Sequence, residues 1–337
     1  MPTLFVATNG LSIWTSTDLG VTLARMPTST AMYSGSRVWA LLETPTGLMA
    51  GSDSGIYRWD TKNGRWNGLP SPTDVQLITA LAVSPFDSNI LLAGTQPAAI
   101  HRSEDGGQSW KNLHVPMKPF VSTGFFEDPK SIVSKTKAVS RPAAQHWTRV
   151  TQILFDTRDP SLVWAGVEID GAWLSKDGGR TFTHHTAGLM SEDVHGFAVF
   201  SNGSRTVFAT TNAGLHTSAD NGENWTFQQI DSEWQYTRSV LFKPGQRDTM
   251  LLTNGNGAPG TKGRLFRSEN AGRNWSDARL PGSVESSVYF LATHPDDPNL
   301  VFAAATLGQL FRSDDGGKTW IALPQRLNEI RAIAWLP

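Results

Sequence analysis

One octapeptide pattern, Ser-x-Asp-x-Gly-x-Thr-Trp, recurs along the chain and constrains its fold more than any other feature. From the second copy on, successive copies start 72, 43, 50 and 45 residues apart, and the first two are 87 apart, or two periods of about 43. A period of roughly 40–50 residues is typical of propellers and solenoids. The copies are Ser16–Leu23, Ser103–Trp110, Ser175–Phe182, Ser218–Trp225, Ser268–Trp275 and Ser313–Trp320.

The octapeptide predicts a tight turn between two strands. Short apolar runs such as Leu310–Arg312 and Ala172–Leu174 precede it. Ser and Asp side chains bond to nearby backbone amides, and the Gly tolerates positive φ. The Trp then packs back under the turn. We therefore expect these Ser and Asp residues to be structural rather than catalytic.

Each repeat unit predicts four short strands, because alternating apolar residues are bounded by Gly, Pro, Asn and Asp. Residues 329–337 hold only a first strand and residues 3–26 only the other three, so pairing the chain ends completes one unit and removes exposed sheet edges. We predict an all-β, seven-bladed β-propeller that forms a single domain over residues 1–337. The other six units are expected at 36–69, 76–113, 146–185, 193–228, 236–280 and 287–323.

One segment, residues 114–145, interrupts the period. It contains Pro116, Pro119, Phe120, four lysines and Arg141. Long loops in compact domains are usually functional or disordered. We interpret this segment as an inserted lid-like loop over the face of the disc that carries the starts of the first strands.

Composition excludes several classes of function. The net charge of −1 argues against a nucleic-acid partner. The chain contains no run of 18 apolar residues, so the sequence predicts no membrane-spanning helix. The first residues, Met1–Phe5, lack a basic segment and do not predict a signal peptide. With no cysteine in the chain, we expect a cytoplasmic protein without disulfides or thiolate metal sites. The oligomeric state stays open.

The candidate site comes from aligning the first strands on a proline-type position near their ends. Side chains two apart on a strand share a face, so two rings of residues are expected around one mouth of the axial channel. The first ring is Trp39, Thr79, Thr151, His195, Arg238, Tyr289 and Arg331. The second ring, two residues earlier, is Arg37, Leu77, Arg149, Asp193, Tyr236, Ser287 and Glu329.

This concentration of arginine predicts a small anionic ligand that bears a carboxylate, because a guanidinium group binds a carboxylate through two parallel bonds. The expected ligand contacts are Arg37, Arg149, Arg238, Arg331, Tyr289, Trp39 and His146. For catalysis we expect His195 as a base oriented by Asp193, with Glu168 and Tyr236 as further catalytic candidates. A divalent metal held by some of His146, His195, Glu168 and Asp170 is an alternative, and the cofactor is otherwise unknown.

The octapeptide resembles the Asp-box, or bacterial neuraminidase repeat. The runs Val163–Gly171, Asp193–Gly196 and Tyr236–Arg238 resemble bacterial Asp-box propellers that are usually labelled sialidase-like or glycosyl-hydrolase-like. The resemblance covers almost the whole chain and implies the fold more firmly than the activity. Similar repeats occur in sortilin-type receptors, photosystem assembly factors and xyloglucanases.

Three functions follow from these observations. The first is an enzyme of hydrolase or lyase type that acts on a small carboxylate-bearing substrate in the axial pocket, by acid–base or metal-assisted chemistry. The second is a scaffold that binds a ligand or assists assembly without catalysis. The third is a sialidase-like glycoside hydrolase, with Tyr236 or Tyr289 paired to Glu329 or Glu168. Six blades, an Arg-Ile-Pro motif and export are usual in sialidases, so the seven units and the absence of that motif count against it.

Overall fold

The computed structural model describes residues 2–27, 32–33, 35–72, 77–123, 144–202, 204–246 and 248–337. These residues form strands joined by turns and loops, arranged as seven four-stranded sheets and one two-stranded sheet. No helix in the described residues is long and apolar enough to cross a membrane. The seven-bladed β-propeller predicted from the repeat is confirmed.

The seven large sheets are the blades, and each blade runs from its innermost strand outward. Blade one consists of β30 (Ile330–Leu336), β1 (Thr3–Thr8), β2 (Ile13–Ser16) and β3 (Ala24–Arg25). Blade two consists of β4 (Val38–Thr44), β5 (Gly47–Ser52), β6 (Gly55–Asp60) and β7 (Arg65–Leu69). Blade three consists of β8 (Leu77–Val83), β9 (Leu91–Gln96), β10 (Ile100–Ser103) and β11 (Lys111–Asn112). Blade four consists of β14 (Arg149–Phe155), β15 (Val163–Glu168), β16 (Gly171–Ser175) and β17 (Thr183–His184). Blade five consists of β18 (Val194–Asn202), β19 (Ser204–Thr211), β20 (Gly214–Ser218) and β21 (Thr226–Gln228). Blade six consists of β22 (Tyr236–Phe242), β23 (Met250–Gly255), β24 (Gly263–Ser268) and β25 (Ser276–Asp277). Blade seven consists of β26 (Val288–His294), β27 (Asp297–Ala305), β28 (Leu310–Ser313) and β29 (Ile321–Ala322).

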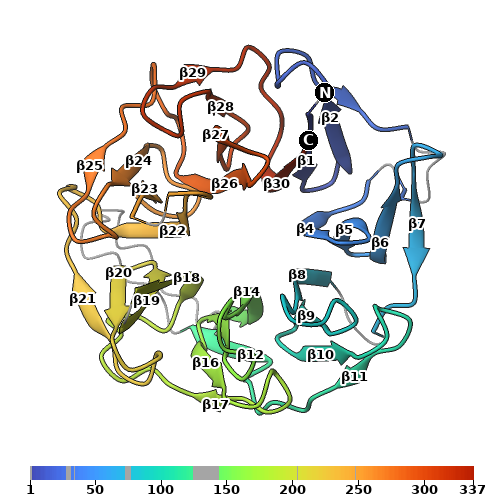
Figure 1. The fold of residues 1–337 in the computed structure, drawn as a ribbon, viewed down its shortest axis with the longest axis vertical. Coiled ribbons are helices and arrows are strands. Elements are labelled where there is room, and N and C mark those ends of the chain that lie inside the picture. Colours follow the sequence, from blue (N-terminus) through green and yellow to red (C-terminus); the bar gives the residue numbers. More distant parts are fainter. Residues whose placement is uncertain are drawn as a thin grey trace, which may run out of the picture.

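The blades stand around a central axis, with one strand of each lining the middle (Figure 1). The chain ends meet in blade one, where β1 pairs antiparallel with β30 from Thr3 opposite Leu336 to Thr8 opposite Ile330. The predicted closure of the ring by the two terminal strands is therefore correct. Closure leaves every inner strand facing the axis and flanked by a blade on each side.

Packing between neighbouring blades supplies the core. The second strand of most blades is almost continuously buried, as in Leu91–Thr95 of β9 and Met250–Gly255 of β23, because another blade covers each of its faces. Each hydrophobic cluster accordingly combines residues of adjacent blades; one joins Leu92 of β9 to Val150 of β14. The short alternating strands of the sequence become stable only as members of this ring.

The six octapeptide turns share one hydrogen-bond network. In the last copy, Ser313 Oγ accepts from the backbone N of Gly317 at 2.8 Å and donates to Asp315 Oδ1 at 2.8 Å. The carboxylate of Asp315 then accepts from Thr319 N and Oγ1 at 2.9 and 2.7 Å. Gly317 has φ of +83°, which a side chain would strain. The serine, aspartate and glycine of the octapeptide thus have a structural role, as the sequence predicted.

The inserted segment follows the last strand of blade three and leads into the first strand of blade four. Its two ends pair as β12 (Phe120–Thr123) and β13 (Ala144–Trp147). Thr148 N donates to the backbone oxygen of Pro119 at 3.2 Å, and Lys118 N donates to Asp170 Oδ2 at 3.0 Å. Asp170 lies in the β15–β16 turn, so the base of the segment is at the mouth end of blade four. Residues 124–143, most of the predicted lid, lie outside the described residues, and the lid stays a prediction.

The turn network predicts a loss of stability in acid. Hydrogen bonds from the side chain four residues on lower the pKa of Asp18, Asp105 and Asp220 from 3.8 to about 2. The pKa of Asp177 and of Asp315 also falls to about 2, although burial acts in the opposite direction. A pKa that is lower in the folded state gives stability that is present above about 3.8 and is lost as the pH falls towards 2. We expect the free energy of unfolding to fall over this interval.

The variant Asp220→Asn tests this origin. It converts the Ser218–Asn224 turn into the arrangement already present in the Ser268–Asn274 turn, where Asn270 accepts from Asn274 N at 2.9 Å. We therefore expect a folded protein whose stability depends less on pH between 4 and 2 in urea titrations. An acid dependence identical to that of the wild type would contradict the assignment.

Candidate functional site in the axial channel

The axial channel has a volume of about 520 Å³ and is lined by the inner strands. Six of the seven residues in the first predicted ring line it, namely Trp39, Thr79, Thr151, His195, Arg238 and Arg331. The seventh, Tyr289, contacts Arg238 at the same level, with 4.7 Å from the guanidinium carbon to the ring centre. Two residues further along these strands the lining is apolar, as at Leu41, Leu81 and Ile153. The alignment of first strands thus placed these side chains correctly.

Some residues of the first ring tie adjacent blades together. Thr79 Oγ1 donates to the backbone oxygen of Val150 at 2.7 Å, and Thr151 Oγ1 donates to that of Val194 at 2.7 Å. His195 makes the next link in the series, with Nδ1 2.6 Å from the backbone oxygen of Thr237. All three links join a residue of one inner strand to the equivalent backbone position of the next blade. His195 therefore takes the place that threonine occupies in blades three and four.

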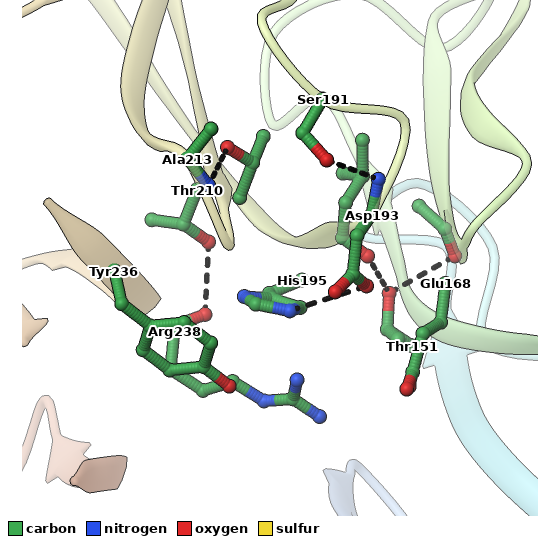
Figure 2. Close-up of polar contacts among 12 residues, drawn as sticks. Thr151, Glu168, Ser191, Asp193, His195, Thr210, Ala213, Tyr236 and Arg238 are labelled. Atoms are coloured by element: carbon green, nitrogen blue, oxygen red, sulfur yellow. Dashed lines mark hydrogen bonds and ion pairs between the residues drawn. The ribbon is translucent and has the colours of Figure 1, made fainter. Parts of the chain in front are cut away.

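His195 also contacts Asp193, two residues earlier in the chain (Figure 2). Nε2 lies 3.3 Å from Asp193 Oδ1, and the His195 side chain is only 1% exposed. Because the Thr237 carbonyl can only accept, Nδ1 must carry a hydrogen, and the Nε2 contact is attractive only if the pair holds a second proton. Both ring nitrogens are thus engaged. Burial alone would raise the pKa of Asp193, but His195, Arg238 and Arg149 together lower it.

Arg149 and Arg331 are the paired arginines of the site. Arg149 forms an ion pair with Glu168, and Arg331 forms one with Glu329. Both guanidinium carbons lie against the ring of Trp39, at 4.7 and 4.1 Å from its centre. Burial and the neighbouring arginines lower the pKa of Arg331 to about 10, despite the opposite effect of Glu329. Burial likewise lowers the pKa of Arg149. Each of these arginines already has a carboxylate partner.

Arg238 differs from the other two. Within the part of the chain that the structure describes, its guanidinium group forms no hydrogen bond and no ion pair. It lies over Tyr289, whose hydroxyl accepts from Tyr236 at 3.0 Å. Burial tends to lower the pKa of Arg238, but the negative charges of Glu168 and Asp193 act to raise it, and it lies above its ordinary value. In Figure 2 no dashed line reaches the guanidinium group of Arg238. Arg238 is thus a charged group at the channel wall whose five donors are available.

Other predicted site residues lie elsewhere. Arg37 is at the mouth but is 49% exposed and pairs with Asp53 at 3.1 Å, so it does not face the arginines of the channel. His146 lies on β13, and its side chain falls outside the described part of the structure. Tyr236 is buried, which raises the pKa of its phenol, so it is a neutral hydrogen-bond donor in this structure. The catalytic roles of His195, Asp193, Glu168 and Tyr236 stay predictions.

Of the residues proposed as metal ligands, the three whose side chains the structure describes, His195, Glu168 and Asp170, are not brought together, and the His146 side chain lies outside the described part. Glu168 contacts Arg149 and His195 contacts Asp193, whereas Asp170 belongs to a different group with His184 and Glu192. That group does not fit a metal either. The Lys118 ammonium lies 3.2 Å from Asp170 Oδ1 and 3.9 Å from Glu192, and His184 Nε2 is 3.0 Å from the backbone oxygen of Asp170. The lysine already supplies the positive charge, and the ring nitrogen is used by a carbonyl.

Two contributors to the site were missed by the sequence reasoning. Asn9 donates to Glu329 at 2.7 Å and accepts from Trp39 Nε1 at 3.4 Å, so it orients both. Trp234 lines a cavity at the mouth together with Asp193 and Tyr236. Extending the strand alignment by two more residues before Tyr236 would have found Trp234. No comparable signal marks Asn9, which lies in the turn between β1 and β2 of blade one.

Comparison with known proteins shows the fold but no family. No protein-family model matches the chain, and no curated protein matches it. Among solved structures it is similar to the GH74 xyloglucanase of Xanthomonas campestris, with a TM-score of 0.66 and 16% identity over 98% of this chain and 52% of that one. A GH74 enzyme of Niastella koreensis gives 0.57 and 15% over 98% and 66%. YCF48 bound to D1 peptide gives 0.50 and 16% over 84% and 85%.

The likeness therefore shows a β-propeller and nothing finer. The chain spans about half to two thirds of the length of these two GH74 enzymes. The Asp-box family suggested by the octapeptide stays a resemblance. Function must be argued from the site, because unrelated activities share this fold.

The blade-linking position of His195 generates a prediction. In His195→Ala the Thr237 carbonyl and Asp193 both lose their partner, which should cost about 1–3 kcal/mol of unfolding free energy. His195→Thr restores the residue type of Thr79 and Thr151 and should recover part of that loss. Urea unfolding of the three proteins measures both effects. An alanine variant as stable as the wild type would show that the link contributes nothing.

Proposed function

We propose that the protein binds a small ligand that bears one carboxylate group in the axial channel, with Arg238 as the main contact of that carboxylate. The observation that carries this proposal is the guanidinium of Arg238, which has no hydrogen-bond or ion-pair partner among the described residues and lies on the wall of a cavity of about 520 Å³. A charged arginine without a partner costs desolvation energy unless something compensates it. A ligand carboxylate would accept two parallel hydrogen bonds from its planar fork.

The charges around the channel favour one negative charge on the ligand. Arg149 and Arg331 are paired with Glu168 and Glu329, and Asp193 contacts His195. The positive charge of Arg238 is left over. A second negative charge on the ligand would face Glu168 and Glu329 without compensation. We therefore prefer a carboxylate to a phosphate monoester.

The geometry supports binding better than catalysis. His195, the predicted base, has both nitrogens engaged and a buried side chain. For hydrolase or lyase chemistry, the remaining acid–base candidates are Glu168 and Asp193, because both line the cavity at the mouth. Loss of turnover in Asp193→Asn with ligand binding kept would favour catalysis. The non-catalytic ligand-binding alternative is thus the preferred function.

The binding proposal is tested by calorimetry with butyrate and benzoate. A charge-assisted hydrogen bond contributes about 1.5–3 kcal/mol, so Arg238→Ala should weaken binding by about 10- to 100-fold. Arg238→Lys, which keeps the charge but loses the fork, should fall between. Arg37→Ala is the matched control, since Arg37 pairs with Asp53 and should leave the affinity unchanged. Equal affinities of wild type and Arg238→Ala would remove Arg238 from the site.

A further inference from the structure

A second cavity, the mouth pocket, adjoins the axial channel. Its volume is about 670 Å³. Two strands pass from one cavity to the other: Asp193 and Tyr236 line the mouth pocket, while His195 and Arg238, two residues further along β18 and β22, line the channel. The mouth pocket is lined by Glu168, Ile169, Asp193, Asn212, Trp234, Gln235, Tyr236, Gly255, Asn256, Gly257 and Ala258. A ligand held by Arg238 therefore has room to extend past Tyr236.

Whereas arginines line the channel, carboxylates line the mouth pocket. Glu168 and Asp193 line it, and no lysine or arginine is among its described lining residues. Glu168 uses Oε2 to contact Arg149, and Asp193 uses Oδ1 to contact His195. The other oxygens, Glu168 Oε1 and Asp193 Oδ2, accept no hydrogen bond from any residue in the described ranges. Two carboxylate oxygens thus stay available to a donor from outside the protein.

The walls of this pocket also suit a positive charge. Tyr236 and Trp234 provide aromatic rings, whose faces attract cations. Trp234 already shows this property, because the guanidinium carbon of Arg264 lies 4.7 Å from its ring centre. Amide groups of Asn212, Gln235 and Asn256 supply neutral hydrogen-bonding partners. Charge, aromatic rings and available acceptors point to the same kind of ligand group.

We infer that the ligand is zwitterionic: an amino acid whose carboxylate binds Arg238 in the channel and whose ammonium group binds Glu168 and Asp193 in the mouth pocket. This inference rests on the proposed carboxylate site and adds the second half of the ligand. It accounts both for an arginine that has no partner among the described residues, Arg238 on β22, and for the incompletely paired carboxylates of Glu168 at the end of β15 and Asp193 just before β18. Neither half alone explains both features.

Matched ligand pairs test the inference by calorimetry. The pairs are glycine with acetate, 4-aminobutyrate with butyrate, and 6-aminohexanoate with hexanoate, so that the distance between the charges is varied. At least one amino acid should bind about tenfold or more tightly than its partner, because an ammonium–carboxylate hydrogen bond forms. Butylamine is the control without a carboxylate and should bind far more weakly than 4-aminobutyrate.

The variant Glu168→Gln tests the two halves of the ligand separately, because its effects on the affinity for the plain carboxylate and on the advantage of the amino acid should have opposite signs. Removing the counter-ion of Arg149 should strengthen binding of the plain carboxylate, while the advantage of the amino acid should shrink. Glu233→Gln is the matched control, because Glu233 pairs with Arg264 at 3.0 Å outside the mouth pocket and should change neither affinity.

The outcomes distinguish the two proposals. Carboxylates that bind in an Arg238-dependent manner, with no advantage for any amino acid, would overturn the zwitterion and leave the carboxylate site intact. An amino-acid advantage that persists in the Glu168→Gln, Asp193→Asn double variant would also overturn it. If neither ligand of any pair binds the wild type, the carboxylate site itself is wrong.

Discussion

Pairing of β1 with β30 closes the ring, and the arrangement of every inner strand depends on it. Each inner strand can bury both faces of its sheet only when a neighbour stands on either side, and the last neighbour is supplied by the two chain ends. Closure also fixes the relative height of the seven inner strands. Side chains at equivalent positions of seven units, far apart in the sequence, therefore converge on one axis.

This constraint explains how a repetitive fold produces a single asymmetric site. The same strand position carries Thr79 and Thr151 in blades three and four, where the hydroxyl links one blade to the next. His195 keeps that link in blade five. In blade six the position carries Arg238, whose side chain makes no such link; the next residue, Ser239, instead donates from Oγ to the backbone oxygen of Tyr289 in blade seven at 2.5 Å. The link between these blades is therefore made by another residue, and the side chain of Arg238 lines the channel.

The sequence was sufficient for the features that depend on backbone register. The octapeptide spacing predicted the turns and the number of blades, and the alignment on proline-type positions predicted that Trp39, His195 and Arg238 surround the axis; both are confirmed. Register alone determines those placements, because side chains alternate strictly along a strand.

The sequence could not predict placements that depend on the conformation of a turn or on which neighbouring charge a side chain pairs with. Ile169 has φ of +66°, and the next residue, Asp170, contacts Lys118 rather than joining Glu168. Arg37 pairs with Asp53 from a turn of its own blade. Such contacts depend on which of several nearby charges is reached at the least cost in desolvation, and sequence periodicity carries no information about that.

The central claim is that Arg238 holds a carboxylate on the axis of the propeller. Crystals soaked in 4-bromobenzoate would test it most directly, because anomalous scattering locates the bromine and the density orients the carboxylate. We predict one ordered molecule in the axial channel, with its carboxylate on the guanidinium of Arg238 and its bromine directed away from it. Bromine sites confined to the outer surface of the blades, with none in the channel, would contradict the claim.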